Sequence, residues 1–155
     1  MKDLILKGRG ITKGIAEGVA LVSKQFFGFT HGLDPSSGRI ADERHEWLNE
    51  NVHGKILVFP YGKSSSSGGL FILEAARNGN CPAGVINVET EPVIGAGFIM
   101  AGLFYEKDIP VIDHLQQNPI DVIKTGDRII MDAYKGEVRI VREKGNDLVN
   151  ICRKI

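Results

Sequence analysis

The sequence predicts one mixed α/β domain, built as a flattened β-barrel or as a three-layer β/β/α sandwich. Two observations lead to this prediction. Between residues 56 and 112, apolar runs of strand length alternate twice with helix-length segments, and strands joined through a helix pair in parallel. The two ends of the chain carry further strand-like runs with turn residues between them, which are typical of antiparallel pairing. A chain of 155 residues is long enough to bury a core as a single domain.

Composition and charge exclude several classes of protein. Apolar residues make up 43% and charged residues 25% of the chain, which is ordinary for a globular protein. The 19 basic and 19 acidic residues cancel, so the chain lacks the basic excess of a nucleic-acid binder. The weakly polar run 92–105 is too short to span a bilayer, and the N-terminal apolar stretch is too short for a signal peptide. We therefore expect a cytoplasmic protein without a nucleic-acid or membrane partner.

Two strands and a glycine-rich loop are expected at the N-terminus. Alternating apolar residues predict a strand over 2–7, and a second strand is expected over 19–22. Arg9 and Lys13 stand among the glycines of the segment between them. Glycine-rich backbone beside basic residues can approach an anion closely, but two tight turns explain the same glycines and are favoured.

A long excursion without clear periodicity follows the second strand. A segment of this length is more often functional than idle, and Trp47 and Leu48 are expected to anchor it to the domain. Within it, Asp42 and His45 stand three residues apart. This spacing allows an acid/base pair on one face of a helix and equally allows a surface capping arrangement. Both interpretations stay open.

A strand, a serine-rich loop and a helix form the centre of the prediction. The apolar run 56–59 predicts a buried strand, which Pro60 ends because proline cannot donate a hydrogen bond to a sheet. A polar loop over 61–69, with four consecutive serines, leads into a helix over 70–77. Such a loop directs backbone N–H groups and hydroxyls to one spot in front of the positive end of the helix dipole. The arrangement suits the binding of an anion.

The serine-rich loop also resembles a nucleotide-binding P-loop and a simple helix cap. Gly62, Lys63 and Ser64 spell the end of a P-loop, but that motif needs a glycine at the position occupied by Leu57. The spacing therefore excludes a P-loop. A solvated turn whose serines only cap the helix stays open as the alternative to an anion site.

The second half of the chain repeats the strand and helix alternation. Strands expected over 84–88 and 109–112 flank a helix over 93–104, with Thr90 as its cap and Pro92 in its first turn. This helix has no polar face. We expect it to be buried on most sides or to be covered by a partner chain.

A β-hairpin is expected near the C-terminus. Its strands are predicted over 128–131 and 137–141, after a turn over 118–127. The single domain is expected to span residues 1–155, with 143–155 as a candidate flexible tail.

Cysteine and histidine usage argues against a metal site contained in this chain. Cys81 and Cys152 lie far apart and form no CxxC motif. An iron–sulfur cluster normally needs three or four cysteine ligands. The four histidines show no metal-binding spacing, so no metal ligand is assigned in this sequence.

Several short motifs, taken together, resemble the small subunit of the aconitase X family, which is similar to the swivelling domain of aconitases. No single motif is specific, but as a set they run from about residue 8 to 138. The matching segments are 8–11, 18–22, 34–38, 42–45, 54–60, 62–66, 78–83, 91–94, 109–111 and 125–127. The resemblance implies the swivelling-domain fold for nearly the whole chain.

The resemblance also implies a hydro-lyase that is active only with a large subunit, as a heterodimer or a higher assembly. Small subunits of this kind are similar to those of archaeal enzymes that dehydrate (R)-5-phosphomevalonate to trans-anhydromevalonate 5-phosphate. That reaction belongs to a modified mevalonate route to isoprenoids. A [4Fe–4S] cluster would be held by the large subunit. Two alternatives stay open: a dehydratase of the same family with another substrate, such as cis-3-hydroxyproline, and a non-catalytic module that binds a partner.

The same resemblance assigns residues to the site. The family's proton-accepting serine stands in a Gly-Lys-Gly-Ser loop, and here it falls on Ser65. The third loop position is Ser64 instead of glycine, so Ser64 and Ser66 are neighbouring candidates for the base. Serine is not a usual general base, and its alkoxide needs stabilisation by the helix N-terminus, by backbone N–H groups and by cations. The candidate substrate-binding residues are Lys63, Ser64, Ser66, Arg9, Lys13, Asp42 and His45.

Overall fold

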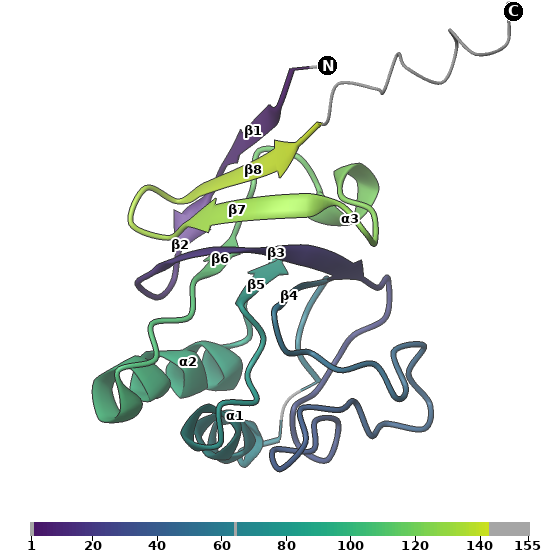
Figure 1. Cartoon of the computed structure of the whole chain (residues 1–155), viewed down its shortest axis with the longest axis vertical. Coiled ribbons are helices and arrows are strands. Elements are labelled where there is room, and N and C mark those ends of the chain that lie inside the picture. Colours follow the sequence, from purple (N-terminus) through teal and green to yellow (C-terminus); the bar gives the residue numbers. More distant parts are fainter. Residues whose placement is uncertain (1, 64, 143–155) are drawn as a thin grey trace, which may run out of the picture.

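The computed structural model describes residues 2–63 and 65–142, and Figure 1 shows a sheet with two helices packed against one side. The strands are β1 (Leu4–Lys7), β2 (Arg9–Gly10), β3 (Ile15–Val22), β4 (Lys55–Phe59), β5 (Gly84–Asn87), β6 (Val111–Asp113), β7 (Arg128–Asp132) and β8 (Glu137–Val141). The helices are α1 (Gly68–Arg77), α2 (Pro92–Tyr105) and α3 (Pro119–Val122). The tail expected over 143–155 lies outside the described residues.

The strands form one sheet that closes on itself. Their order is β1-β8-β7-β3-β4-β5-β6-β2, and a single residue, Gly8, separates β1 from β2. The segment 4–10 therefore pairs with β8 at one end of this order and with β6 at the other. Strands β3 to β6 run parallel, while β1, β8, β7 and β3 pair antiparallel. The predicted mixed α/β fold with a flattened barrel is confirmed.

Alternate residues of β4 face two separate cores. Ile56 and Val58 point into the barrel, among residues of β1, β7 and β8. Leu57 and Phe59 point the other way, into a core shared with α1, α2 and the segment 23–54. One buried strand can serve both cores because side chains alternate along it. The flattened barrel thus supplies two layers, and α1 and α2 form the third (Figure 1).

The glycine-rich segment after β1 is more regular than the sequence indicated. It forms β2, and β3 begins at Ile15 and not at residue 19, so the predicted loop with tight turns is wrong in both places. Gly10 lies inside β2, where a Cβ atom would collide with the backbone oxygen of Ala133. Glycine here allows two backbones to approach closely and does not mark a turn.

Two smaller predictions also need correction. The N-cap of α2 is Glu91 and not Thr90, because the Glu91 carboxylate accepts from the N–H groups of Val93 at 3.0 Å and Ile94 at 3.1 Å. The two oxygens of this one carboxylate thus satisfy two free donors of the first turn. Residues 119–122, expected as part of a turn, form the short helix α3.

Helices α1 and α2 pack against each other through glycines. A Cβ atom on Gly97 would lie 2.9 Å from the Cα atom of Gly69 and 3.0 Å from Cδ1 of Ile72. Gly95 has ordinary clearance, since its Cβ atom would meet the Ile11 side chain at 3.4 Å. Glycine weakens a helix, so the close approach of the two backbones explains its presence at position 97.

We expect Gly97→Ala to lower the free energy of unfolding by about 1–3 kcal/mol, because the added methyl group forces α1 and α2 apart. Gly95→Ala is the matched control in the same helix. It should leave stability unchanged or raise it by up to about 1 kcal/mol through helix propensity. Urea unfolding followed by circular dichroism measures both variants. Equal stabilities would show that the glycine contact does not set the spacing of the helices.

One face of α2 is not covered by the described residues. Ile94, Phe98 and Ala101 are buried, whereas Leu103 is 74% and Phe104 is 67% exposed. The helix is therefore not buried on most sides, and its cover by a partner chain remains a prediction. Within residues 2–63 and 65–142, no helix has the length and apolar character needed to cross a membrane.

The segment 23–54 is anchored by Trp47 but not by Leu48. Trp47 is buried and donates its indole N–H to the backbone oxygen of Val22 at 3.3 Å. Leu48 is 38% exposed, so the prediction that it anchors the segment is wrong.

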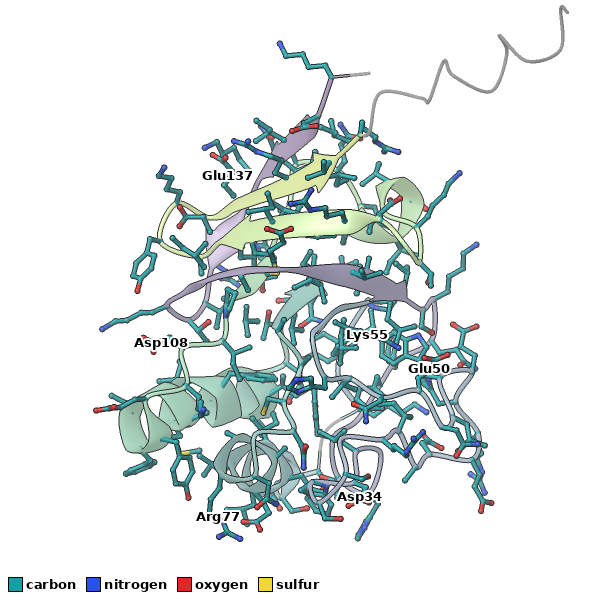
Figure 2. All side chains as sticks on the ribbon, viewed as in Figure 1. Asp34, Glu50, Lys55, Arg77, Asp108 and Glu137 are labelled. Carbon is teal, nitrogen blue, oxygen red and sulfur yellow. The ribbon has the colours of Figure 1, made fainter. Side chains whose placement is uncertain are left out.

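The same segment is also tied to α1 and to β4. Asn78, the C-cap of α1, donates from its side chain to the backbone oxygen of Pro35 at 3.1 Å, next to the turn at Asp34. Figure 2 shows Glu50 and Lys55 close together where the segment enters β4, and their ion pair measures 2.7 Å. The segment is thus tied to α1 within its course and to β4 near its C-terminal end.

Candidate active site

The serine-rich loop lies at the carboxyl edge of the parallel strands. It follows β4, and the segments after β5 and β6 leave the sheet at the same edge. Phe27 fixes the start of the loop by donating its N–H to the oxygen of Tyr61 at 3.3 Å and accepting from the N–H of Lys63 at 3.0 Å. Ligands of α/β sheets commonly bind at this edge, because the loops of several strands converge there.

Three hydroxyl groups, one of them that of Ser65, form a cluster. Ser65 Oγ lies 2.8 Å from Ser67 Oγ and 3.1 Å from Thr30 Oγ1, and these two atoms lie 3.2 Å apart. The backbone N–H of Ser67 also donates to Ser65 Oγ, at 3.3 Å. Ser65 is exposed, so its hydroxyl is accessible to a ligand. A hydroxyl oxygen with several donors around it carries negative charge more easily than an isolated serine.

Helix α1 begins directly behind this cluster. Its N-cap is Ser67, as the sequence indicated, but the Ser67 side chain makes no capping hydrogen bond, so the predicted role of a serine side chain as cap is wrong. The N–H of Gly68 donates to the backbone oxygen of Ser65 at 3.0 Å. The helix is 10 residues long, and the positive end of its dipole therefore lies next to Ser65.

The first turn of α2 supports the loop. A Cβ atom on Gly62 would collide with the side chain of Ile94 and lie 3.0 Å from Cβ of Glu91. Only glycine fits between the loop and the helix at this point. Glu91 is itself buried, and its side chain caps the N-terminus of α2. The surface against which the loop packs is therefore rigid.

Arg9 lies at the same edge of the sheet, where β2 pairs with β6. Its guanidinium donates to both oxygens of Asp113 at 2.9 Å, and Asp113 also accepts from the N–H of Thr90 at 2.8 Å. Burial raises the pKa of the Asp113 carboxyl, but the hydrogen bonds from Arg9 and Thr90 outweigh it, and the net pKa is lowered. Arg9 therefore helps to close the barrel, while its side chain remains 54% exposed.

The Asp113 carboxylate makes stability sensitive to acid. Its folded-state pKa lies below the ordinary value of about 3.9, so its ionised form stabilises the fold above that pH. This contribution is lost as the pH falls through the folded-state pKa.

We expect Asp113→Asn to lower the free energy of unfolding at pH 7 by about 1–3 kcal/mol, because hydrogen bonds to a buried group are lost. In urea unfolding between about pH 2 and pH 7, the free energy of unfolding of the variant should fall less steeply with falling pH than that of the wild type. Parallel pH profiles of the two proteins would contradict this account.

Asp42 and His45 are each occupied by the local chain. Asp42 accepts from the N–H of Arg44 at 3.0 Å, and Nδ1 of His45 accepts from the N–H of Trp47 at 3.1 Å. The His45 ring is buried against Phe27 and Trp47. Burial lowers the pKa of His45, so the imidazole is neutral at pH 7. These contacts favour the capping interpretation for Asp42 and place His45 beneath the loop, against Phe27.

Lys13 lies at the opposite edge of the parallel strands. The chain from β2 onward runs antiparallel along β6, and Thr12 Oγ1 donates to the backbone oxygen of Ile109, ahead of β6, at 2.6 Å. Lys13 and Asp108 line a hollow of about 410 Å³ beside the C-terminal half of α2. Figure 2 shows Asp108 between this helix and β3. The structure therefore does not bring Lys13 together with the serine loop.

A family model matches nearly the whole chain. It is described as the aconitase X swivel domain, and it covers residues 5–140. This chain belongs to the aconitase X swivel domain family. The family expected from the short motifs is thus confirmed.

Named relatives of this aconitase X swivel domain have similar lengths. The phosphomevalonate dehydratase small subunit of Methanocaldococcus jannaschii is 41% identical over 138 residues, covering 89% of this chain and 98% of that protein. The protein of the same name from Methanosarcina acetivorans is 34% identical over 148 residues, covering 96% and 99%. The crystal structure of Thermococcus kodakaraensis aconitase X in its holo-form matches with a TM-score of 0.81 at 34% identity, covering 90% of this chain and 99% of that chain.

Two hydroxyls of this swivel domain's site were missed by the sequence-based prediction. Thr30 stands 35 positions before Ser65, and no pattern around it indicates the contact. Ser67 was only one of the four loop serines that could cap α1, and no contact with Ser65 was predicted. Ser66 is exposed in the same loop. The candidate Ser64 lies outside the described residues.

The described part of the swivel domain offers no metal centre. Within residues 2–63 and 65–142, no group of three or more His, Cys, Asp or Glu side chains could hold an ion. Burial raises the pKa of the Cys81 thiol to about 12, so this thiol is protonated at neutral pH and is a poor ligand. The side chains of the described residues therefore do not fit an iron–sulfur cluster.

Proposed function

We propose that this chain is the small subunit of a cytoplasmic phosphomevalonate dehydratase. With a large subunit it removes water from (R)-5-phosphomevalonate and yields trans-anhydromevalonate 5-phosphate, in a modified mevalonate route to isoprenoids. Relatives of that name, 34% and 41% identical to this chain, support the substrate class. The observation that carries the role of this chain is the cluster of the Thr30 hydroxyl, the Ser67 hydroxyl and the Ser67 N–H around Ser65 Oγ.

Ser65 is the base in this proposal. It takes the proton from the carbon next to the substrate carboxylate, while the hydroxyl group leaves from the adjacent carbon. An isolated serine hydroxyl is too weak an acid to supply an alkoxide at neutral pH. The hydroxyls of Ser67 and Thr30, the N–H of Ser67 and the dipole of α1 stabilise the charged oxygen. These donors are held in place beforehand, because Phe27 and Gly62 fix the loop.

The carboxylate and phosphate of the substrate need positive partners. Lys63 is exposed at the start of the serine loop, and Arg9 is partly exposed at the same edge of the sheet. We assign these two side chains to the anionic groups of the substrate, together with the exposed hydroxyl of Ser66 in the same loop. His45 packs against Phe27, which fixes the start of the loop, and neither Asp42 nor His45 contacts the substrate in this proposal.

The remaining chemistry belongs to the large subunit. When bound there, a [4Fe–4S] cluster would supply a Lewis-acidic iron that assists departure of the substrate hydroxyl. The part played by this chain is to present Ser65 to the substrate at the partner's surface. The exposed position of Ser65 supports this arrangement, because an uncovered base needs a partner to exclude water from the reaction.

Reconstitution of the complex tests the proposed function. The chain is co-expressed with a large subunit, the cluster is restored without oxygen, and loss of 5-phosphomevalonate is measured with the complex and with each subunit alone. We expect turnover by the complex only. Turnover of cis-3-hydroxyproline instead would contradict the proposed substrate and agree with the proposed class of enzyme, a hydro-lyase. A stable, cluster-loaded complex that dehydrates neither compound would favour a non-catalytic module.

A further inference from the structure

We infer that Ser67 is a positioning residue, whose hydroxyl donates to Ser65 Oγ and holds the base in one orientation toward the substrate. The inference rests on the proposed function, since it assigns a task to a neighbour of the proposed base. It concerns a side chain that neither the motifs nor the comparisons assign.

Ser67 does not perform the usual task of a serine at its position. A serine at a helix N-cap ordinarily accepts a hydrogen bond from an N–H group of the first turn. In α1 the side chain of Ser67 makes no such bond. Its Oγ lies instead 2.8 Å from Ser65 Oγ, the shortest of the three contacts within the hydroxyl cluster. The orientation of this side chain therefore serves Ser65 and not the helix.

Thr30 holds the other side of the cluster. Its Oγ1 lies 3.1 Å from Ser65 Oγ and 3.2 Å from Ser67 Oγ. The preceding residue, Phe29, is buried against Phe98 with the ring centroids 5.6 Å apart. This packing fixes the backbone that carries Thr30, so the hydroxyl of Ser67 has a defined neighbour on each side.

The cluster favours the charged form of Ser65 over the neutral form. A neutral Ser65 hydroxyl is both donor and acceptor, so it needs only one donor from its neighbours. An alkoxide only accepts, and the hydroxyls of Ser67 and Thr30 can then both turn to donate to it. Removing the Ser67 hydroxyl takes away one of these donors and releases the Ser65 side chain.

Two substitutions at Ser67 in the reconstituted complex test the inference. Ser67→Ala is expected to lower kcat by about 10- to 100-fold, somewhat less than the loss of a sole oxyanion donor. KM should change little, because Ser67 acts through the base and not on the bound substrate. Ser67→Thr keeps a hydroxyl and the backbone N–H, and should restore most of the rate. The melting temperature should be similar in both variants, because no capping bond is lost.

The control removes an exposed hydroxyl elsewhere in the chain. Ser36→Ala acts in the turn at Asp34, where the Ser36 hydroxyl donates to the Asp34 carboxylate at 2.7 Å. It should keep the wild-type kcat. A Ser67→Ala complex with wild-type kcat, or equal losses in Ser67→Ala and Ser67→Thr, would overturn the inference.

Crystal structures of the complexes provide a second readout that needs no turnover. The Ser65 side chain should occupy more than one rotamer in Ser67→Ala and a single rotamer in Ser67→Thr and in the wild type. If the wild-type complex has no dehydratase activity, the proposed function fails, and this comparison still decides the inference. A single, unchanged Ser65 rotamer in Ser67→Ala would then overturn it.

Discussion

Ser65→Ala is expected to lower the rate of 5-phosphomevalonate dehydration by roughly 100- to 10 000-fold, the usual contribution of a general base. A methyl group cannot accept a proton, and the hydroxyls of Ser67 and Thr30 lose their hydrogen-bond partner. The fold should be unaffected, because Ser65 is exposed and precedes α1. The variant should therefore still assemble with the large subunit.

The measurement compares complexes of equal cluster content under steady-state conditions. Ser36→Ala serves as the control for removal of a surface hydroxyl, and it should change the rate by no more than about twofold. Ser66→Ala separates the two neighbouring serines. Full activity in Ser65→Ala with a large loss in Ser66→Ala would assign the role of the base to Ser66 instead of Ser65. Full activity in both would show that neither serine is the base.

Phe27→Ala is expected to lower the free energy of unfolding by about 3–5 kcal/mol, as for other buried aromatic residues. The Phe27 ring is fully buried, with ring centroids 5.1 Å from Phe29, 5.4 Å from Trp47 and 5.7 Å from Phe59. The same residue fixes the start of the serine loop through its backbone. A cavity at this position should therefore loosen the loop as well as the core, and activity should fall along with stability.

Urea unfolding of the isolated chain measures this loss of stability. Phe26→Ala is the control, because Phe26 precedes Phe27 in the chain but is 49% exposed and contacts Tyr61 at the edge of the ring. The substitution of Phe26 should lower the free energy of unfolding by less than about 1 kcal/mol. Similar losses in the two variants would show that the aromatic cluster does not depend on Phe27.

The parallel half of the fold could be predicted from the sequence for a physical reason. Strands β4 and β5 are covered on both faces, so they consist of continuous apolar runs that local inspection finds. Closure of the barrel could not be predicted. It depends on Gly10 approaching the backbone of Ala133, a contact between distant parts of the chain, and in the sequence that glycine is typical of a turn.

The candidate site, like the fold, could be predicted from the sequence only in part. The serine loop could be predicted because its strand, loop and helix are contiguous in the sequence. The contact between Thr30 and Ser65 could not, because it depends on how the segment 23–54 folds over the helices. Lys13 and Arg9 are close in sequence, yet the chain runs along β6 between them and leaves them at opposite edges of the sheet.

Hydration of trans-anhydromevalonate 5-phosphate in D₂O tests the central claim most directly, because the base that removes a proton in one direction delivers it in the other. The wild-type complex should add one solvent-derived deuterium to the carbon next to the carboxylate, detected by mass spectrometry and proton NMR. The Ser65→Ala complex should bind the compound and incorporate no deuterium over the same period. Incorporation at the wild-type rate in Ser65→Ala would contradict the assignment of Ser65 as the base.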